Sequence, residues 1–330
     1  MGFISAYKAS LKPSDVEEPI DRWFHRPLGH VIAYSSNPFS FISPNLLTML
    51  SIVFGWLAAI AIVWPFPYHM QVGALLLLVS VALDCADGQL ARMRKSSSAF
   101  GRMLDGIADL LVIVAVAPAT GWAAIQQTIA AQQPTWVVVL VGVLAAVTGV
   151  TSSFHTGMYD HYKNVVLRFT SPTFKEGEDY ETARKRWEES KDHAPWWQLI
   201  AWRIYLYYVK SQEDVVRGFD PYGVVAIGDL PAYDPRIEAI FRKHGMKPFI
   251  WLRGWFGFGS LVFGLQVVNF FECVVLLIAF RLVLMNAVFY LYVRPLQRKA
   301  SQKIFAELEA EGLFKRPVPL AASGEPVTAS

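Results

Sequence analysis

Charged residues and cysteines are scarce in this sequence of 330 residues. Only 17% of the residues are charged and 54% are hydrophobic, a balance typical of integral membrane proteins rather than of soluble domains. The two cysteines, Cys85 and Cys273, both lie at or inside apolar stretches, so the sequence implies no disulfide framework and gives little support to a thiolate metal site. The net charge of +3 is too small to suggest a nucleic-acid partner.

Long apolar stretches make up much of the sequence. Six of them are long enough to cross a bilayer as helices, and they cover residues 45–64, 69–86, 103–124, 136–156, 251–269 and 273–293. The sequence therefore predicts an all-α integral membrane protein with six transmembrane helices.

The predicted spans divide the chain into five parts. We expect a cytoplasmic N-terminal segment with an interfacial helix, spans one to four, a cytoplasmic helical insertion, spans five and six, and a cytoplasmic tail. These parts cover residues 1–40, 41–156, 157–250, 251–296 and 297–330.

The distribution of positive charge predicts the orientation of the chain. The connections at 65–68, 126–135 and 270–272 contain no Lys or Arg, and nearly all basic residues lie on the other side. Positively charged loops stay in the cytoplasm. We therefore expect both termini to be cytoplasmic, together with the connection between spans two and three. The compact chain favours a bacterial plasma membrane.

Three helical segments are predicted outside the spans. The insertion is predicted to contain a polar helix at 179–191 and an aromatic one at 195–210, and residues 13–35 resemble a further interfacial helix. Trp and Tyr at such density suit the headgroup layer of a bilayer. Packing of the aromatic helix on the protein's own cytoplasmic face is an equally open reading.

The most informative pattern is D-x2-D-G-x2-A-R-x8-G-x3-D-x3-D, which begins at Asp84 and ends at Asp109. Asp84 and Asp87 are three residues apart at the end of span two. Gly101, Asp105 and Asp109 follow at intervals of four and share one face of span three. Because the two helices are joined by a short connection, we expect an antiparallel pair whose carboxylates converge at the membrane boundary.

Four converging carboxylates require that some of them be protonated or that cations neutralise them. At about 5 Å and an effective dielectric constant near 20, each pair repels by roughly 3 kcal/mol. Ligands that are all oxygen favour Mg²⁺, Mn²⁺ or Ca²⁺, and two divalent ions would neutralise the set. Such a pair of ions is the usual arrangement for in-line phosphoryl displacement. Helix capping, or pairing with Arg92, Arg94 or Arg102, would explain one aspartate but not all four.

The remaining motif residues suit a substrate that carries phosphate. Gly88 lets a ligand approach the backbone, and Gly101 opens space on the opposite wall. Arg92 offers a planar fork for phosphate oxygens. Asp109, the deepest acid of the set, is the candidate general base.

These residues resemble the CDP-alcohol phosphotransferase family, the membrane enzymes that build phospholipids from cytidine-diphosphate intermediates. All eight signature positions match, and Pro44-Asn45-x-x-Thr48 resembles a further element of the family. The resemblance covers residues 20–156 by motif and 251–294 by topology alone.

The resemblance implies a site and a reaction. Asp84, Asp87, Asp105 and Asp109 would hold two Mg²⁺ or Mn²⁺ ions, with Asp109 also the base. The CDP moiety would be bound by Gly88, Arg92, Gly101, Asn45 and Thr48. An acceptor hydroxyl would attack the β-phosphorus and release CMP. Members of this family usually form homodimers within the bilayer.

The donor and acceptor are less clear from the motif. Members that use CDP-choline commonly carry His after the third aspartate, whereas this sequence has Gly106, which favours CDP-diacylglycerol as donor. A polar alcohol is then the acceptor. Inositol phosphate or another polyol phosphate is favoured, because cationic or polar side chains near the site could bind it; these are Arg281, Lys163, Arg168 and His155.

Three alternatives stay open. A CDP-alcohol such as CDP-choline could instead donate its phospho-alcohol to diacylglycerol. A membrane prenyltransferase would need a second aspartate-rich segment far along the chain, and the sequence has none. An intramembrane cation transporter would place its acids near the midplane and would leave Gly88, Arg92 and Gly101 unexplained.

Overall fold

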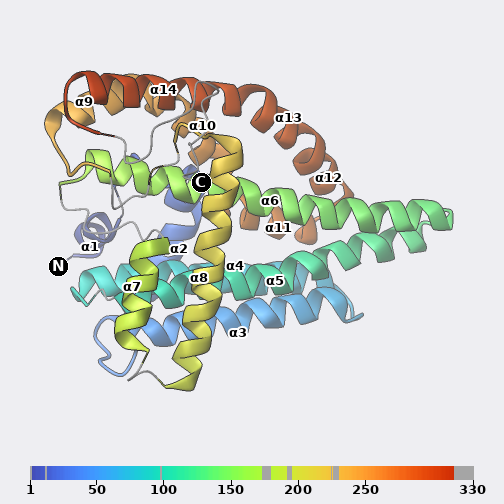
Figure 1. Cartoon of the computed structure of the whole chain (residues 1–330). Coiled ribbons are helices and arrows are strands. Elements are labelled where there is room, and N and C mark those ends of the chain that lie inside the picture. The colour runs from blue at the N-terminus through green and yellow to red at the C-terminus, as the bar shows by residue number, and fades with distance from the viewer. Residues whose placement is uncertain are drawn as a thin grey trace. The chain divides into compact units, whose positions relative to one another are not determined.

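The computed structural model describes residues 2–11, 13–96, 99–172, 180–191, 195–223, 225 and 230–315 (Figure 1). All regular secondary structure in this part of the chain is helical, which confirms the predicted all-α class. The chain forms two compact units. Unit 1 contains Met1–Ser152 and Phe258–Leu284, and unit 2 contains Ser153–Gly257 and Met285–Ser330.

The first part of the chain forms α1 (Phe3–Ser10), the π-helix η1 (Asp21–His25), α2 (Arg26–Ser36), α3 (Pro44–Val63), α4 (His69–Met93), α5 (Ala99–Ala130) and α6 (Thr135–Thr170). The second part forms α7 (Tyr180–Ser190), α8 (Trp196–Phe219), α9 (Pro235–His244), α10 (Met246–Trp255), α11 (Phe258–Phe270), α12 (Val274–Ala279), η3 (Phe280–Met285), α13 (Asn286–Val288), η4 (Phe289–Val293) and α14 (Arg294–Ala310).

Among the described residues, five helices are long and apolar enough to cross a membrane. They are Pro44–Val63, His69–Met93, Met103–Ala130, Thr135–Thr170 and Val274–Ala310. The chain is therefore an integral membrane protein, as the sequence predicts.

The predicted span at 251–269 is not a single helix. Phe256 and Gly257 separate α10 from α11, and the 13 residues of α11 extend only about 20 Å, less than the roughly 30 Å of a hydrocarbon core. The predicted count of six spans is therefore not confirmed. The helix that contains the last predicted span is longer than that span, because helical structure continues from Val274 to Ala310. Of the predicted tail, residues 316–330 lie outside the described residues.

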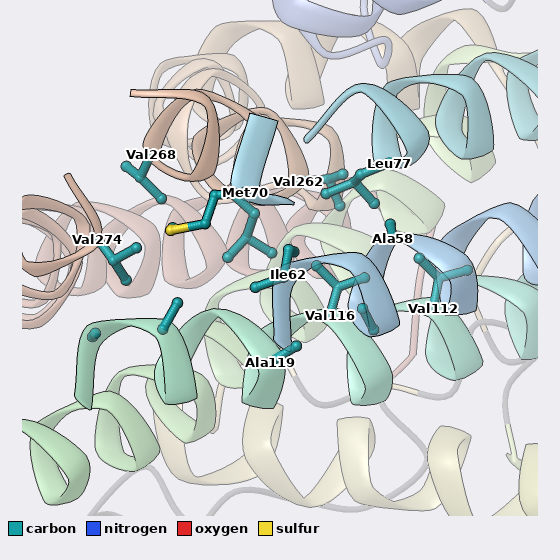
Figure 2. Close-up of a cluster of buried hydrophobic side chains, with 14 of the residues drawn as sticks. Ala58, Ile62, Met70, Leu77, Val112, Val116, Ala119, Val262, Val268 and Val274 are labelled. Atoms are coloured by element: carbon teal, nitrogen blue, oxygen red, sulfur yellow. The ribbon is translucent and has the colours of Figure 1, made fainter. Parts of the chain in front are cut away.

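A core of small and branched apolar side chains holds unit 1 together. Figure 2 shows side chains from α3, α4, α5, α11 and α12 meeting around Ile62, Leu77 and Val116. Glycine permits the closest approaches: a Cβ at Gly73 would lie 2.4 Å from Ile62 Cγ1, and one at Gly55 would lie 2.6 Å from Val112 Cγ2. Helix α3 consequently packs against both α4 and α5 (Figure 1).

Unit 2 has a buried carboxylate at its centre. Asp220 accepts hydrogen bonds from Tyr162 Oη and Ser301 Oγ, both at 2.5 Å, and from the backbone nitrogen of Tyr222 at 3.2 Å. Burial raises the pKa of Asp220, and the hydrogen bonds from Ser301 and Tyr162 oppose that rise. The loop after α8 is thereby anchored to α6 and α14.

Helix α8 is amphipathic but longer than predicted. Trp202, Val209 and Val216 are buried, whereas Trp196 and Tyr207 are 73% and 78% exposed. The outward face thus carries the aromatic residues that suit a headgroup layer.

Candidate functional site

The end of α4 and the first turns of α5 bring three carboxylates together. Asp84 and Asp87 lie on α4 and Asp105 lies on α5, and one oxygen of each lies within 4.8 Å of the other two. Asp87 is buried, while Asp84 and Asp105 are partly exposed. This convergence agrees with the predicted antiparallel pair.

Asp109 does not belong to this close group. It lies one helical turn beyond Asp105 on α5, is partly exposed, and is near enough to Asp84 for their charges to interact. The structure thus brings together three of the four predicted ligands and leaves Asp109 beside them, where an approaching substrate can reach it.

The three converging carboxylates fit a divalent cation. Asp84 Oδ1 is buried and has no hydrogen-bond partner among the described residues, a costly state for a carboxylate oxygen. A Mg²⁺ or Mn²⁺ ion would satisfy that oxygen, and oxygen ligands are the type these ions prefer.

Thr48 fixes the orientation of one of these carboxylates. Ser43 caps α3 by accepting a hydrogen bond from the Leu46 nitrogen at 3.1 Å. Four residues beyond Pro44, the buried Thr48 hydroxyl donates to Asp87 Oδ2. Asn45, on the first turn, is exposed. Thr48 was predicted to line a nucleotide pocket; its hydroxyl also lies 3.2 Å from the Pro44 carbonyl oxygen.

Replacing Thr48 with valine is expected to lower the affinity for Mg²⁺ by about 10- to 100-fold, the usual effect of losing a group that orients a metal ligand. Thr48→Ser, which keeps the hydroxyl, is the matched control. The affinity is measured as the Mg²⁺ concentration that gives half of the maximal thermal stabilisation. Equal affinities for the valine and serine variants would contradict an orienting role.

Arg94 organises the loop in front of α3. Its guanidinium group donates to the carbonyl oxygens of Ile42 at 2.6 Å, Ser36 at 2.9 Å, and Asn37 and Phe39 at 3.0 Å each. These bonds tie the end of α4 to the loop that leads into α3. Arg94 therefore helps to place Thr48 beside Asp87, and it is not a counter-ion of the aspartates.

Arg92 lies against Gly88 on α4. A Cβ at Gly88 would approach Arg92 Nη1 to 3.3 Å, so a larger residue would displace the guanidinium group. Arg92 Nε donates to the Ser10 carbonyl oxygen at 2.5 Å, and Nη2 is buried with no hydrogen-bond partner among the described residues. An anion that reached Nη2 would satisfy it. Gly101 lies in the first turn of α5 and is partly exposed.

The predicted acceptor-site residues have structural partners. In unit 2, Lys163 pairs with Asp160 at 2.5 Å, Arg168 donates to the Leu230 carbonyl at 2.9 Å, and His155 packs against the rings of Phe256 and Phe289. Arg281, in unit 1, is 3% exposed and lies on the π-helix η3. The Glu18 carboxylate is near enough to act on its charge.

The N-terminal segment contains a cluster of buried charges that the sequence did not predict. The segment was expected to contain an interfacial helix, and five of its charged or titratable side chains are buried: Glu17, Glu18, His25, Arg26 and His30. His25 Nδ1 lies 2.8 Å from Asp21 Oδ1. The spacing of four residues in Asp21/His25 and Arg22/Arg26 was the available signal.

Comparison with known proteins yields one result. Residues 41–166 match the family model described as CDP-alcohol phosphatidyltransferase. This range contains α3, α4, α5 and most of α6, and with them every candidate metal ligand. No curated protein and no solved structure matches the chain.

Proposed function

The chain belongs to the CDP-alcohol phosphatidyltransferase family through residues 41–166, and from this premise we propose that it transfers a phosphatidyl group from CDP-diacylglycerol to a polar alcohol and releases CMP. The family makes it a transferase of phospholipid synthesis. The convergence of Asp84, Asp87 and Asp105 within 4.8 Å is the observation that supports the chemistry most strongly.

Asp84, Asp87 and Asp105, with Asp109 beside them, would hold two Mg²⁺ or Mn²⁺ ions. Bound there, the ions supply electrostatic stabilisation of the charge on the pyrophosphate and the leaving group.

The protein side chains account for the remaining steps. Arg92 would donate from Nη2 to a phosphate oxygen of the donor, and Gly88 and Gly101 would leave room for the CDP moiety beside Asn45 and Thr48. The carboxylate of Asp109 would accept the proton of the acceptor hydroxyl as that oxygen attacks the β-phosphorus. The bond between the β-phosphorus and the bridging oxygen then breaks, and CMP leaves.

CDP-diacylglycerol is the proposed donor because Gly106 follows Asp105. A polyol phosphate such as inositol phosphate is the proposed acceptor. Arg281 on η3 is a candidate to bind its phosphate. Lys163, Arg168 and His155 are the other candidates.

We also propose a membrane, an orientation and an oligomeric state for the enzyme. The asymmetry of positive charge supports a cytoplasmic active site and cytoplasmic termini, and the compactness of the chain favours a bacterial plasma membrane. Residues 1–40, 157–250 and 297–330 would be cytoplasmic, with the spans inside 41–156 and 251–296. The family resemblance favours a homodimer.

The test is CMP release by purified protein in lipid bilayers. CDP-diacylglycerol and Mg²⁺ are offered with inositol phosphate, glycerol phosphate, serine or inositol, and Asp109→Asn serves as control. Release with one acceptor, lost in the variant, is the expected result. Release only from CDP-choline with diacylglycerol would overturn the donor assignment. No release from either donor, together with Mg²⁺ transport, would favour the cation transporter.

A further inference from the structure

The side chain of Arg92 is held from outside the matched region. Its Nε bonds at 2.5 Å to the carbonyl oxygen of Ser10, the last residue of α1. The final carbonyls of a helix lack partners within the helix and carry partial negative charge, so the end of α1 attracts a guanidinium group. The bond occupies one donor of Arg92 and leaves the buried Nη2 without a partner among the described residues.

Helix α1 is itself fixed in place by an aromatic cluster. His30 Nε2 lies 3.0 Å from the Phe3 carbonyl oxygen, and the Phe3 ring packs against the rings of His30 and Tyr34 at 4.6 and 5.1 Å. Tyr7 Oη donates to the Arg22 carbonyl at 3.1 Å. Burial and the nearby Glu17 carboxylate raise the pKa of Tyr7, which keeps this hydroxyl a donor.

The connection between α1 and α2 is anchored as well. Glu17 Oε1 lies 2.6 Å from Arg26 Nε in a buried ion pair. Glu18 accepts from the backbone nitrogens of Gly259 and Ser260 at 3.0 Å each and so caps α11. Because these contacts fix the chain on both sides of Ser10, its carbonyl oxygen holds a defined position beside Arg92.

We propose that α1, residues 3–10, is a positioning element that orients Arg92 for the phosphate of the CDP donor. An unrestrained arginine loses considerable rotamer freedom when it binds phosphate, and a bond already made at Nε reduces that loss. The inference rests on the proposed function. It adds that residues outside the matched range of 41–166 determine donor affinity.

Removing residues 2–10 is expected to raise KM for the CDP donor about 10-fold and to leave kcat nearly unchanged. The reason is that Arg92 binds the donor phosphate in the ground state and the transition state alike. Ile4→Ala is the matched control on the same helix, because Ile4 is 70% exposed; it should leave both constants unaltered. Phe3→Ala and Tyr7→Phe loosen α1 without deleting it and should raise KM in the same direction.

The decisive measurement is a double-mutant cycle with Arg92→Ala. If α1 acts through Arg92, the truncation raises KM in the wild-type background and not in the Arg92→Ala background. Equal increases in both backgrounds, or an unchanged KM after truncation, would overturn the inference while the transferase assignment stands. If the truncated chain does not fold, the same cycle is run with Phe3→Ala. Absence of CMP release from the wild-type protein is a separate result, which would reject the proposed function and this inference with it.

Discussion

Replacing Asp109 with asparagine is expected to lower the rate of CMP release by about 10²- to 10⁴-fold, the usual contribution of a positioned general base. Asparagine has nearly the same shape as aspartate, and its amide does not accept the acceptor's proton at neutral pH. Asp109 lies outside the close group of Asp84, Asp87 and Asp105 and is partly exposed, so a substrate can reach it.

The rate is measured as single-turnover CMP release, and the helical circular dichroism signal reports whether the fold is kept. Glu272→Gln is the matched control, because Glu272 is an acid in the α11–α12 connection that accepts a hydrogen bond from Gln71 at 2.8 Å. The control should retain full activity. Full activity in the Asp109 variant would instead remove Asp109 as the base.

Removing divalent metal is expected to abolish CMP release reversibly and to lower the thermal stability of the protein. Carboxylate oxygens within 4.8 Å repel by about 3 kcal/mol per ionised pair at an effective dielectric constant of 20. A bound ion offsets this repulsion, and at 100 times its Kd it stabilises the native state by about 2.7 kcal/mol.

Asp84→Asn separates the two effects. Without metal, this variant should be more stable than the wild type, because it removes one repelling charge. With Mg²⁺ it should gain little stability and show almost no turnover. The melting temperature in detergent, with EDTA and then with excess Mg²⁺, measures the stability in each condition. CMP release measures the turnover.

Asp220→Asn provides the contrast for the stability measurement. Asp220 is also buried, but its Oδ2 accepts hydrogen bonds from Tyr162 and Ser301, so we expect its replacement to destabilise the protein at every Mg²⁺ concentration. An Asp84→Asn protein that is less stable than wild type in EDTA would show that the three carboxylates do not repel, and hence that they need no ion.

The aspartate site could be predicted from spacing because it depends on two neighbouring helices. Asp84 and Asp87 share an end of α4, and Asp105 follows after a connection too short to permit anything except an antiparallel pair. The break between α10 and α11 could not be predicted from the sequence pattern. Hydropathy summed over 251–269 does not register that the helix ends at Trp255 and begins again at Phe258.

Contacts between residues far apart in the chain were not predictable in this way. Ser10 and Arg92 are 82 positions apart, and Glu18 bonds the α11 backbone 241 positions away. No periodicity links such residues. In the sequence alone, the charged residues at 17–26 look like those of an ordinary polar interfacial helix. Their burial is evident only from the partners that the fold gives them.

The sequence by itself determined the class of the protein and the identity of its acidic residues. Apolar segments in a bilayer must satisfy their own backbone hydrogen bonds and therefore form helices, and helical geometry then places the motif aspartates on common faces. Only the tertiary structure decided what surrounds those acids: Thr48 on Asp87, Arg94 on the loop before α3, and the end of α1 on Arg92. The physical reason is that such contacts depend on how packed helices bring distant segments together, and local sequence does not encode that packing in a readable pattern.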